Sequence, residues 1–116
     1  MSTDQQIERE IQAKGLTAPR ITPADIEANI VSEVYIVPAD AVGRMAELGA
    51  PVHASLSLLT ICVLVLRNGF TVTGESACAS PENFNAELGR KIARQAAVNK
   101  IWPLMGYELR SKLAQA

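Results

Sequence analysis

The dipeptide Asn68-Gly69 lies between two runs of β-forming residues, and it constrains the fold more than any other feature of the chain. Asn-Gly is the strongest short-range signal for a β-hairpin, because a type I′ turn needs positive φ at both of its central residues. The flanking runs therefore predict an antiparallel hairpin over about residues 57–78, closed by a two-residue loop.

The two-residue loop also predicts which residues of the two strands face each other. Arg67 is expected opposite Phe70, and Cys62 is expected opposite Glu75. The other predicted pairs are Val65 with Val72 and Val63 with Gly74. The first strand is apolar on both faces, and such strands are normally covered on both sides. The hairpin therefore needs helices, further strands or another subunit.

The chain before the hairpin predicts one good helix and a short strand. Thr22 is a favourable N-cap, and Pro23 suits the first helical position. The β-rich stretch VYIV is stopped by Pro38. The expected order is a flexible or partly helical arm over 1–20, a helix over about 22–32, a strand over 34–37 and a short helix over 39–48.

A long kinked helix is predicted over about 81–113, capped by Ser80 and bent at Pro103. One apolar face runs along the helix at i, i+4 spacing, and a second ridge of small residues is expected at a tight helix crossing. The apolar face is Phe84, Leu88, Ile92 and Ala96, and the small ridge is Ala86, Gly89, Ala93 and Ala97. The fold class is therefore α+β, with the hairpin packed between the two helices in one domain over 21–116.

Composition and charge exclude several classes of protein. The 116 residues carry a formal net charge of −1, so no basic field favours bulk nucleic-acid binding. The longest apolar run is too short to span a membrane, and the polar N-terminus is not a signal peptide, so a cytoplasmic protein is expected. Cys62 and Cys78 lack metal spacing and are predicted to be unpaired. With His53 as the single histidine, no metal, no cofactor and no enzymatic activity are expected.

Three motifs in the second half of the chain resemble a known family. The hairpin reads RNGFTVTGESAC, the following segment SPENFNAELGRKIA, and the end of the helix AVNKIWPLMGYELRSKL. In this order, over about residues 22–113, they resemble a family of small phage and prophage proteins named for gene products of phages N-four and Sf-six. The resemblance implies a tailed-phage origin and an accessory role in an infected or lysogenic bacterial host. It implies no catalytic residue.

Three residues of the hairpin are candidate ligand contacts. Arg67 is either a solvated arginine or a fork for phosphate or carboxylate. Phe70 is either a core residue or a stacking platform for a base. Glu75 is the only charge in its strand. It is either satisfied within the chain, by Arg90, Arg94 or backbone N–H groups, or it accepts from a base amino group or a ribose hydroxyl.

The long helix adds a basic side and two aromatic residues to the candidates. Arg90 and Arg94 project together, either in a solvated face or as a wall that binds anions. Trp102 and Tyr107 are either packing anchors or ligand platforms. The seven candidate ligand-binding residues are Arg67, Phe70, Glu75, Arg90, Arg94, Trp102 and Tyr107.

Two functions are compatible with these residues. The first is an accessory protein with an anti-defence role that sequesters a cyclic oligonucleotide or a related nucleotide immune signal. The second is a protein–protein inhibitor or adaptor that acts on a host enzyme, which predicts an exposed apolar patch and no pocket. A homo-oligomer is expected in either case, formed through the Gly89/Ala93 ridge or through the sheet edge.

Overall fold

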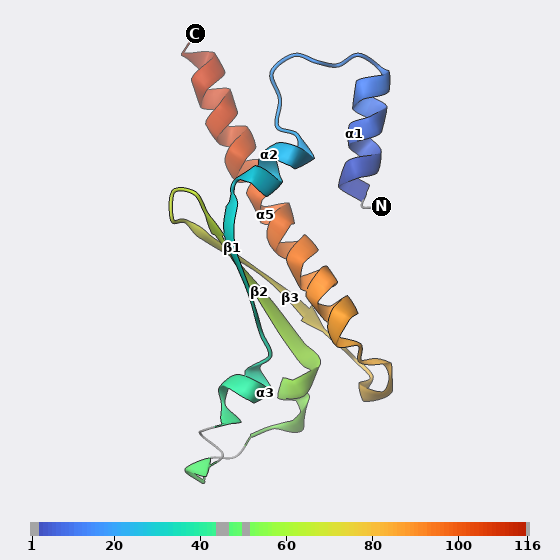
Figure 1. The fold of residues 1–116 in the computed structure, drawn as a ribbon, viewed down its shortest axis with the longest axis vertical. Coiled ribbons are helices and arrows are strands. Elements are labelled where there is room, and N and C mark those ends of the chain that lie inside the picture. Colours follow the sequence, from blue (N-terminus) through green and yellow to red (C-terminus); the bar gives the residue numbers. More distant parts are fainter. Residues whose placement is uncertain (1–2, 44–46, 50–51, 116) are drawn as a thin grey trace.

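The fold is a three-stranded antiparallel sheet with one long helix packed diagonally across one face (Figure 1). The computed structural model describes residues 3–43, 47–49 and 52–115. The predicted α+β class is confirmed, with β1 as an additional strand of the sheet. The elements are α1 (Thr3–Ala13), α2 (Pro23–Ala28), β1 (Ile30–Ile36), α3 (Pro38–Ala41), η1 (Ala54–Leu58), β2 (Leu59–Leu66), β3 (Thr71–Ala77), η2 (Pro81–Asn83) and α5 (Ala86–Ala114).

The hairpin between β2 and β3 forms as predicted, but its register is shifted by one residue. The Leu66 N–H donates to the Phe70 carbonyl at 2.9 Å, so the loop contains three residues instead of two. Gly69 has a φ of +89°, whereas Asn68 keeps a negative φ. These angles fit a type I turn followed by a left-handed glycine, the usual three-residue hairpin loop. The Asn68 side chain closes the loop by accepting from the Phe70 N–H at 2.9 Å.

The shifted register makes all four predicted cross-strand pairs wrong. Cys62 lies opposite Gly74, and Glu75 lies opposite Ile61. A shift of one residue exchanges the two faces of a strand, because side chains alternate along it. The predicted pairs that do not form are Arg67 with Phe70, Cys62 with Glu75, Val65 with Val72 and Val63 with Gly74.

The helix α5 packs on the sheet through its small residues. A Cβ atom added to Gly74 would lie 2.1 Å from the Ala93 carbonyl oxygen, so the strand and helix backbones are in direct contact. One added to Gly89 would lie 3.0 Å from Thr60 Oγ1. The close approach predicted at Gly89 therefore occurs, against the chain's own sheet. The buried apolar residues are Ile26, Cys62, Leu64, Leu66, Val72, Ala93, Ala97, Val98 and Ile101.

The apolar face at i, i+4 spacing lies outside the core. Leu88 is 55% exposed and Ile92 is 56% exposed. Glycine and alanine let the helix approach the sheet closely, so the small ridge took the core position and the larger side chains were left on the flank. Because Ala93 is fully buried within the chain, this ridge is not free for an oligomer contact. Of the two predicted oligomer contacts, only the sheet edge is therefore available to a second copy.

Several element boundaries also differ from the predictions. The helix predicted over 22–32 ends at Ala28, and β1 begins at Ile30 instead of residue 34, because residues 30–36 pair with β2. The helix α5 is capped by Asn85 instead of Ser80, and it continues past Pro103. The helix predicted over 39–48 is described only in part: α3 ends at Ala41, and residues 44–46 lie outside the described residues.

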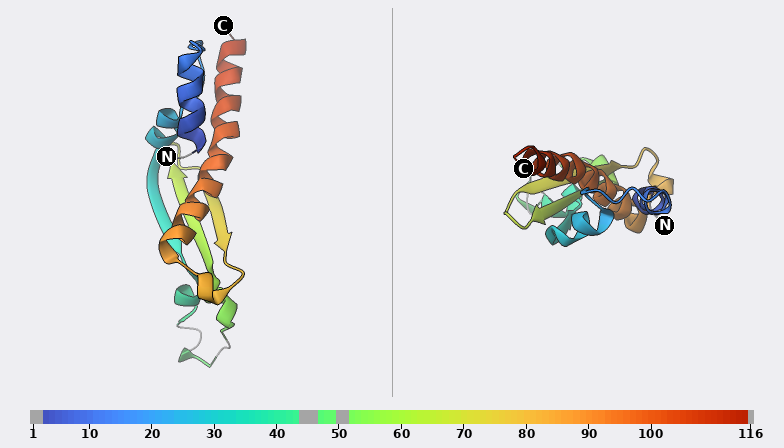
Figure 2. Two further views of the ribbon diagram at one scale, coloured as in Figure 1. Left: turned by 90° about the vertical axis from the view of Figure 1, so that its right-hand side faces the viewer. Right: turned by 90° about the horizontal axis from the view of Figure 1, so that it is seen from above.

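The molecule is elongated, with a Cα radius of gyration of 18.1 Å and extents of 60 × 30 × 18 Å. A compact domain of this length would have a radius of gyration of about 13 Å. The helix α1 and the C-terminal half of α5 extend past the same end of the sheet (Figure 2). The helix α1 buries no residue completely. The elongated shape therefore leaves much apolar surface without cover from the described part of the chain.

Candidate functional site

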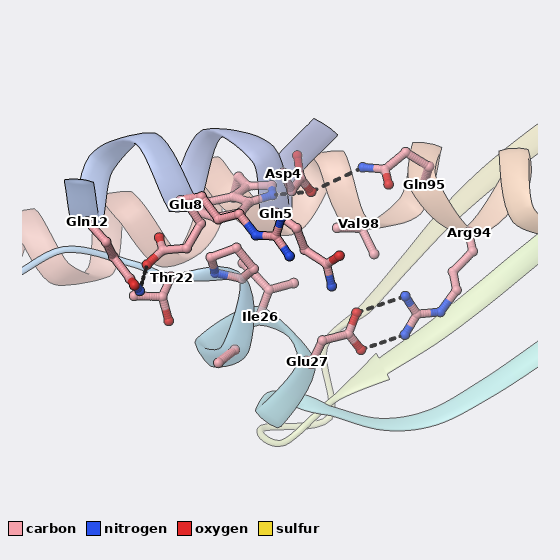
Figure 3. A pocket seen from close by; sticks show the side chains of 14 residues that line it. Asp4, Gln5, Glu8, Gln12, Thr22, Ile26, Glu27, Arg94, Gln95 and Val98 are labelled. Atoms are coloured by element: carbon pink, nitrogen blue, oxygen red, sulfur yellow. Dashed lines mark hydrogen bonds and ion pairs between the residues drawn. The ribbon is translucent and has the colours of Figure 1, made fainter. Parts of the chain in front are cut away.

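A dense polar cluster lies where α5 passes β1 and the end of α2. Arg94 Nε donates to Glu33 Oε1 at 2.8 Å, and its two terminal nitrogens donate to the Glu27 carboxylate at 2.9 and 2.7 Å (Figure 3). A planar guanidinium can hold two carboxylates in this way because its donors have a fixed fork geometry. Arg94 is the candidate residue with the most defined partners, and its side chain is 28% exposed.

Tyr35 and Cys62 lie beside these charged groups. Glu27, Glu33, Tyr35, Cys62 and Arg94 together form the Arg94 cluster. The Tyr35 hydroxyl donates to Glu33 at 2.7 Å. The Arg94 guanidinium, and then this hydroxyl, lower the pKa of Glu33. Burial, and then the Glu33 carboxylate, raise the pKa of Tyr35 and also the pKa of the Cys62 thiol. At neutral pH the cluster therefore holds ionised Glu33 and Arg94 beside a neutral phenol and a neutral thiol.

Arg90 lies one helical turn before Arg94, and the two side chains therefore project from neighbouring positions on α5. Arg90 is exposed, and it forms no ion pair with the residues that the structure describes. The two arginines balance the charges of Glu27 and Glu33, so the group as a whole is neutral. It offers a free guanidinium for an anion and fixed carboxylate oxygens for hydroxyl or amino groups.

A groove of about 830 Å³ runs between α1, α2 and α5, and the Arg94 cluster lies at one end of it (Figure 3). Trp102 Nε1 donates to Asp4 on α1 at 3.3 Å, so the half-buried Trp102 acts as an anchor between helices. Glu8 on α1 accepts from Arg20 at 2.7 Å, and this contact lowers the pKa of Glu8 to about 2. Carboxylates outnumber arginines on the walls, so the groove itself does not favour phosphate.

The predicted candidates do not converge on one site within a single chain. Arg67 lines a separate hollow of about 510 Å³ with Asp25 and Glu108. The Arg67 backbone N–H donates to the Asn29 carbonyl at 3.0 Å, which ties the hairpin loop to the end of α2. No pocket lining in the described part of the chain includes both Arg67 and Glu75.

Three further candidates point into solvent. Phe70 is 56% exposed and Tyr107 is 79% exposed, so neither is a core residue. Glu75 is exposed on the face of the sheet away from α5, where it accepts from Thr73 Oγ1 at 3.3 Å. An exposed carboxylate needs no buried partner, and Arg94 is already bonded to Glu27 and Glu33.

Sequence reasoning missed Glu27 and Glu33, which hold Arg94, and Tyr35, which donates to Glu33. Glu33 and Tyr35 are two residues apart, which places them on one face of a strand. Beginning the strand at residue 34 hid this pattern, because Glu33 then fell between the predicted helix and the predicted strand. A strand that began at Ile30 would have shown it.

The face of the sheet opposite α5 is apolar and has no cover from the described residues. Glu75 and Glu33 are the only charged residues in the strands, and Glu33 points to the α5 side. The prediction that both faces of β2 are covered is therefore met on one face only. The outward apolar side chains are Leu59, Ile61, Val63 and Val65 of β2, with Val34 at 49% and Ile36 at 38% exposure on β1.

A model of the phage protein (N4 Gp49/phage Sf6 gene 66) family matches residues 21–113. The matched segment contains the sheet, α5 and the whole Arg94 cluster, whereas α1 lies outside it. No curated protein and no solved structure matches the chain. Within the described segments, no helix is long and apolar enough to cross a membrane, and no acidic, histidine or cysteine cluster has the composition of a metal site.

Proposed function

We propose that this chain, which belongs to the phage protein (N4 Gp49/phage Sf6 gene 66) family, is a phage accessory protein that binds a nucleotide signal and catalyses no reaction. The observation that supports this proposal is that Arg90, which forms no ion pair with the described residues, lies one helical turn before the fixed Arg94. The proposed role is anti-defence: a phage benefits when a nucleotide immune signal is sequestered in the infected or lysogenic host.

The cluster has the groups that a nucleotide needs for recognition. Arg90 offers an unpaired guanidinium to a phosphate, and charge-assisted bonds of this kind are about twice as strong as neutral ones. The Glu27 and Glu33 carboxylates accept from ribose hydroxyls or base amino groups, and Arg94 fixes their positions. Arg94 therefore acts as a positioning residue, and Arg90 contacts the phosphate.

We expect a cyclic di- or trinucleotide, or an ADP-ribose derivative, to raise the melting temperature. A ligand at 100 times its Kd stabilises the folded state by about 2.7 kcal/mol, which is a shift of about 10 °C for a chain of this size. Arg90→Ala should lose most of this shift and keep the melting temperature of the free protein, since Arg90 has no described partner. Arg110→Ala, an exposed arginine further along α5, is the matched control. The proposal fails if no nucleotide shifts the transition, or if Arg90→Ala responds like the wild type.

The uncovered sheet face favours a second candidate function, the binding of another protein. Monomeric soluble proteins rarely expose a contiguous apolar surface of this kind without a partner for it. Val63 lies at its centre, on the middle strand, between Val34 and Thr73 of the neighbouring strands. This candidate corresponds to an inhibitor or adaptor that acts on a host enzyme.

For this second candidate, Val63→Lys should reduce the amount of a cross-linked host partner by at least about tenfold, the effect of losing a central interface residue. Thr71→Lys, on the edge strand β3, is the control because it adds the same charge at the rim of the face. Quantitative mass spectrometry of cross-linked infected cells measures both variants. Equal recovery with both would contradict binding through this face.

A further inference from the structure

We propose that two copies of this chain pair through the outer edges of their β1 strands and form a continuous six-stranded sheet. The strand order is β1-β2-β3, so the outer edge of β1 has no neighbour among the described residues. The N–H and C=O groups along such an edge are a template for another strand. The completion of a ligand site by this pairing rests on the proposed function, whereas the pairing itself does not.

The β1 edge lacks the features that normally prevent pairing. Edge strands are usually protected by lysine, by proline or by a charge pointing at the incoming strand. Ile30–Ile36 contains no lysine and no proline, and its one charge, Glu33, is bonded to Arg94 on the α5 side. The bulge at Val31 interrupts the strand only near its start.

The composition of the two edges favours β1 over β3. On the open face, β1 presents Ser32, Val34 and Ile36, whereas β3 presents Thr71, Thr73 and Glu75. Pairing two β1 strands about Val34 therefore joins the two valines on the axis and places Ile36 of each copy opposite Ser32 of the other. It also places the more polar β3 strands at the outer edges of the new sheet. A second copy is the occupant that matches this edge, because the same apolar strand is supplied from both sides.

The position of α5 leaves room for this partner. The helix packs on β2 and β3 (Figure 2), and its Arg94 side chain reaches Glu33 of β1. Both sides of β1 are therefore open along most of its length, and all of its residues except Ile30 and Tyr35 are classed as exposed. A second β1 strand would lie about 4.8 Å away without meeting the helix of the first copy.

One antiparallel register satisfies the side chains on both faces. With Val34 on the two-fold axis, Glu33 of each copy lies opposite Tyr35 of the other, the pair that is already bonded within one chain. Centring on Glu33 instead would place two carboxylates opposite each other, which is unfavourable. In the Val34 register, both α5 helices lie on the same side of the sheet, because directly opposed residues point to the same face.

This arrangement also completes the candidate ligand site. The two α5 helices would flank a trough whose floor is the paired β1 strands. Glu33 and Tyr35 would line its floor, and Arg90 and Arg94 would line its walls, from both copies. A single chain supplies only half of this trough. A two-fold symmetric or double-phosphate nucleotide therefore fits the pair of chains better than it fits one chain.

The pairing is tested by measuring the mass of the purified full chain with light scattering after size-exclusion chromatography. We expect a dimer for the wild type, and for Val34→Lys a dissociation constant raised about a hundredfold or more, because like charges would meet on the axis. Val34 is 49% exposed in one chain, so the variant should keep its fold by circular dichroism. Mixing Val34→Lys with Val34→Glu should restore the dimer, since residue 34 faces its counterpart.

Two control variants separate the possible results. Val63→Lys should remain dimeric, because Val63 lies on the middle strand and contacts only its own chain in this arrangement. A monomeric wild type overturns the proposal, as does a dimer that Thr71→Lys or Val63→Lys disrupts while Val34→Lys does not. These outcomes do not depend on any ligand. A dimer that binds no nucleotide therefore leaves the pairing intact and contradicts only the proposed function.

Discussion

Gly74→Ala should destabilise the fold by about 3 kcal/mol or more, since overpacking of a core costs about 1–3 kcal/mol even where side chains can adjust. The added Cβ would lie 2.1 Å from the Ala93 carbonyl oxygen and 2.3 Å from the Ala97 nitrogen. Both atoms belong to the backbone of α5, so no flexible side chain can move aside. Because a domain of this size has a total stability of about 5–15 kcal/mol, the variant should melt at a much lower temperature or fail to fold.

The matched control for Gly74→Ala is Gly106→Ala, and urea denaturation measures both. Gly106 lies inside α5, and nothing stands within 4 Å of an added Cβ atom there. Alanine is favoured over glycine in a helix by about 1 kcal/mol, so this variant should be slightly more stable than the wild type. A Gly74→Ala protein as stable as the wild type would mean that the helix does not cross the sheet at this point.

The sequence predicted the elements of this fold better than their packing. Local signals were sufficient for the hairpin, the N-cap at Thr22 and the long C-terminal helix. The register failed because Asn68-Gly69 is compatible with two loop lengths, and φ at Asn68 distinguishes them only in the folded chain. The number of residues in one loop thus decided which face every later side chain of β3 took.

The choice of core face on α5 was not readable from periodicity alone. Both the large face with Leu88 and Ile92 and the small ridge with Gly89 and Ala93 have helical spacing. Gly74 on the facing strand decides between them, because two glycines at one crossing permit backbone contact. Pairing a glycine in a strand with a small-residue ridge in a helix is a signal that would have predicted the packing.

The candidate site was predicted in part for a related reason. Arg90 and Arg94 were found from their spacing, but the partners of Arg94 lie 61 and 67 residues earlier in the chain, on β1 and α2. Such long-range ion pairs carry no local signature. In the folded chain Arg94 is bonded to Glu27 and Glu33, and we therefore propose Arg90 as the residue that contacts phosphate.

Arg94→Gln should lose about 1–2 kcal/mol of stability and most of the nucleotide response together. This loss of stability is at the lower end for a charged hydrogen-bond network. Glu27 and Glu33 are 55% and 37% exposed, so water can hydrate their carboxylates when Arg94 is removed. Arg94→Lys should recover only part of the loss, since an ammonium cannot hold both carboxylates with three aligned donors. Denaturant unfolding with and without nucleotide measures both effects.

The pH dependence of this loss separates charge from packing. Arg94 lowers the pKa of Glu33 in the folded chain below its ordinary value of 4.5. The carboxylate therefore stabilises the fold fully above about that value, and the contribution disappears as the pH falls through the lower pKa of the folded state. The difference in stability between wild type and Arg94→Gln should accordingly be full at pH 7 and shrink below pH 4.5. A difference that stays constant down to the lowest pH at which both proteins fold would assign the effect to packing of the Arg94 stem, and Glu33 would then have no electrostatic role.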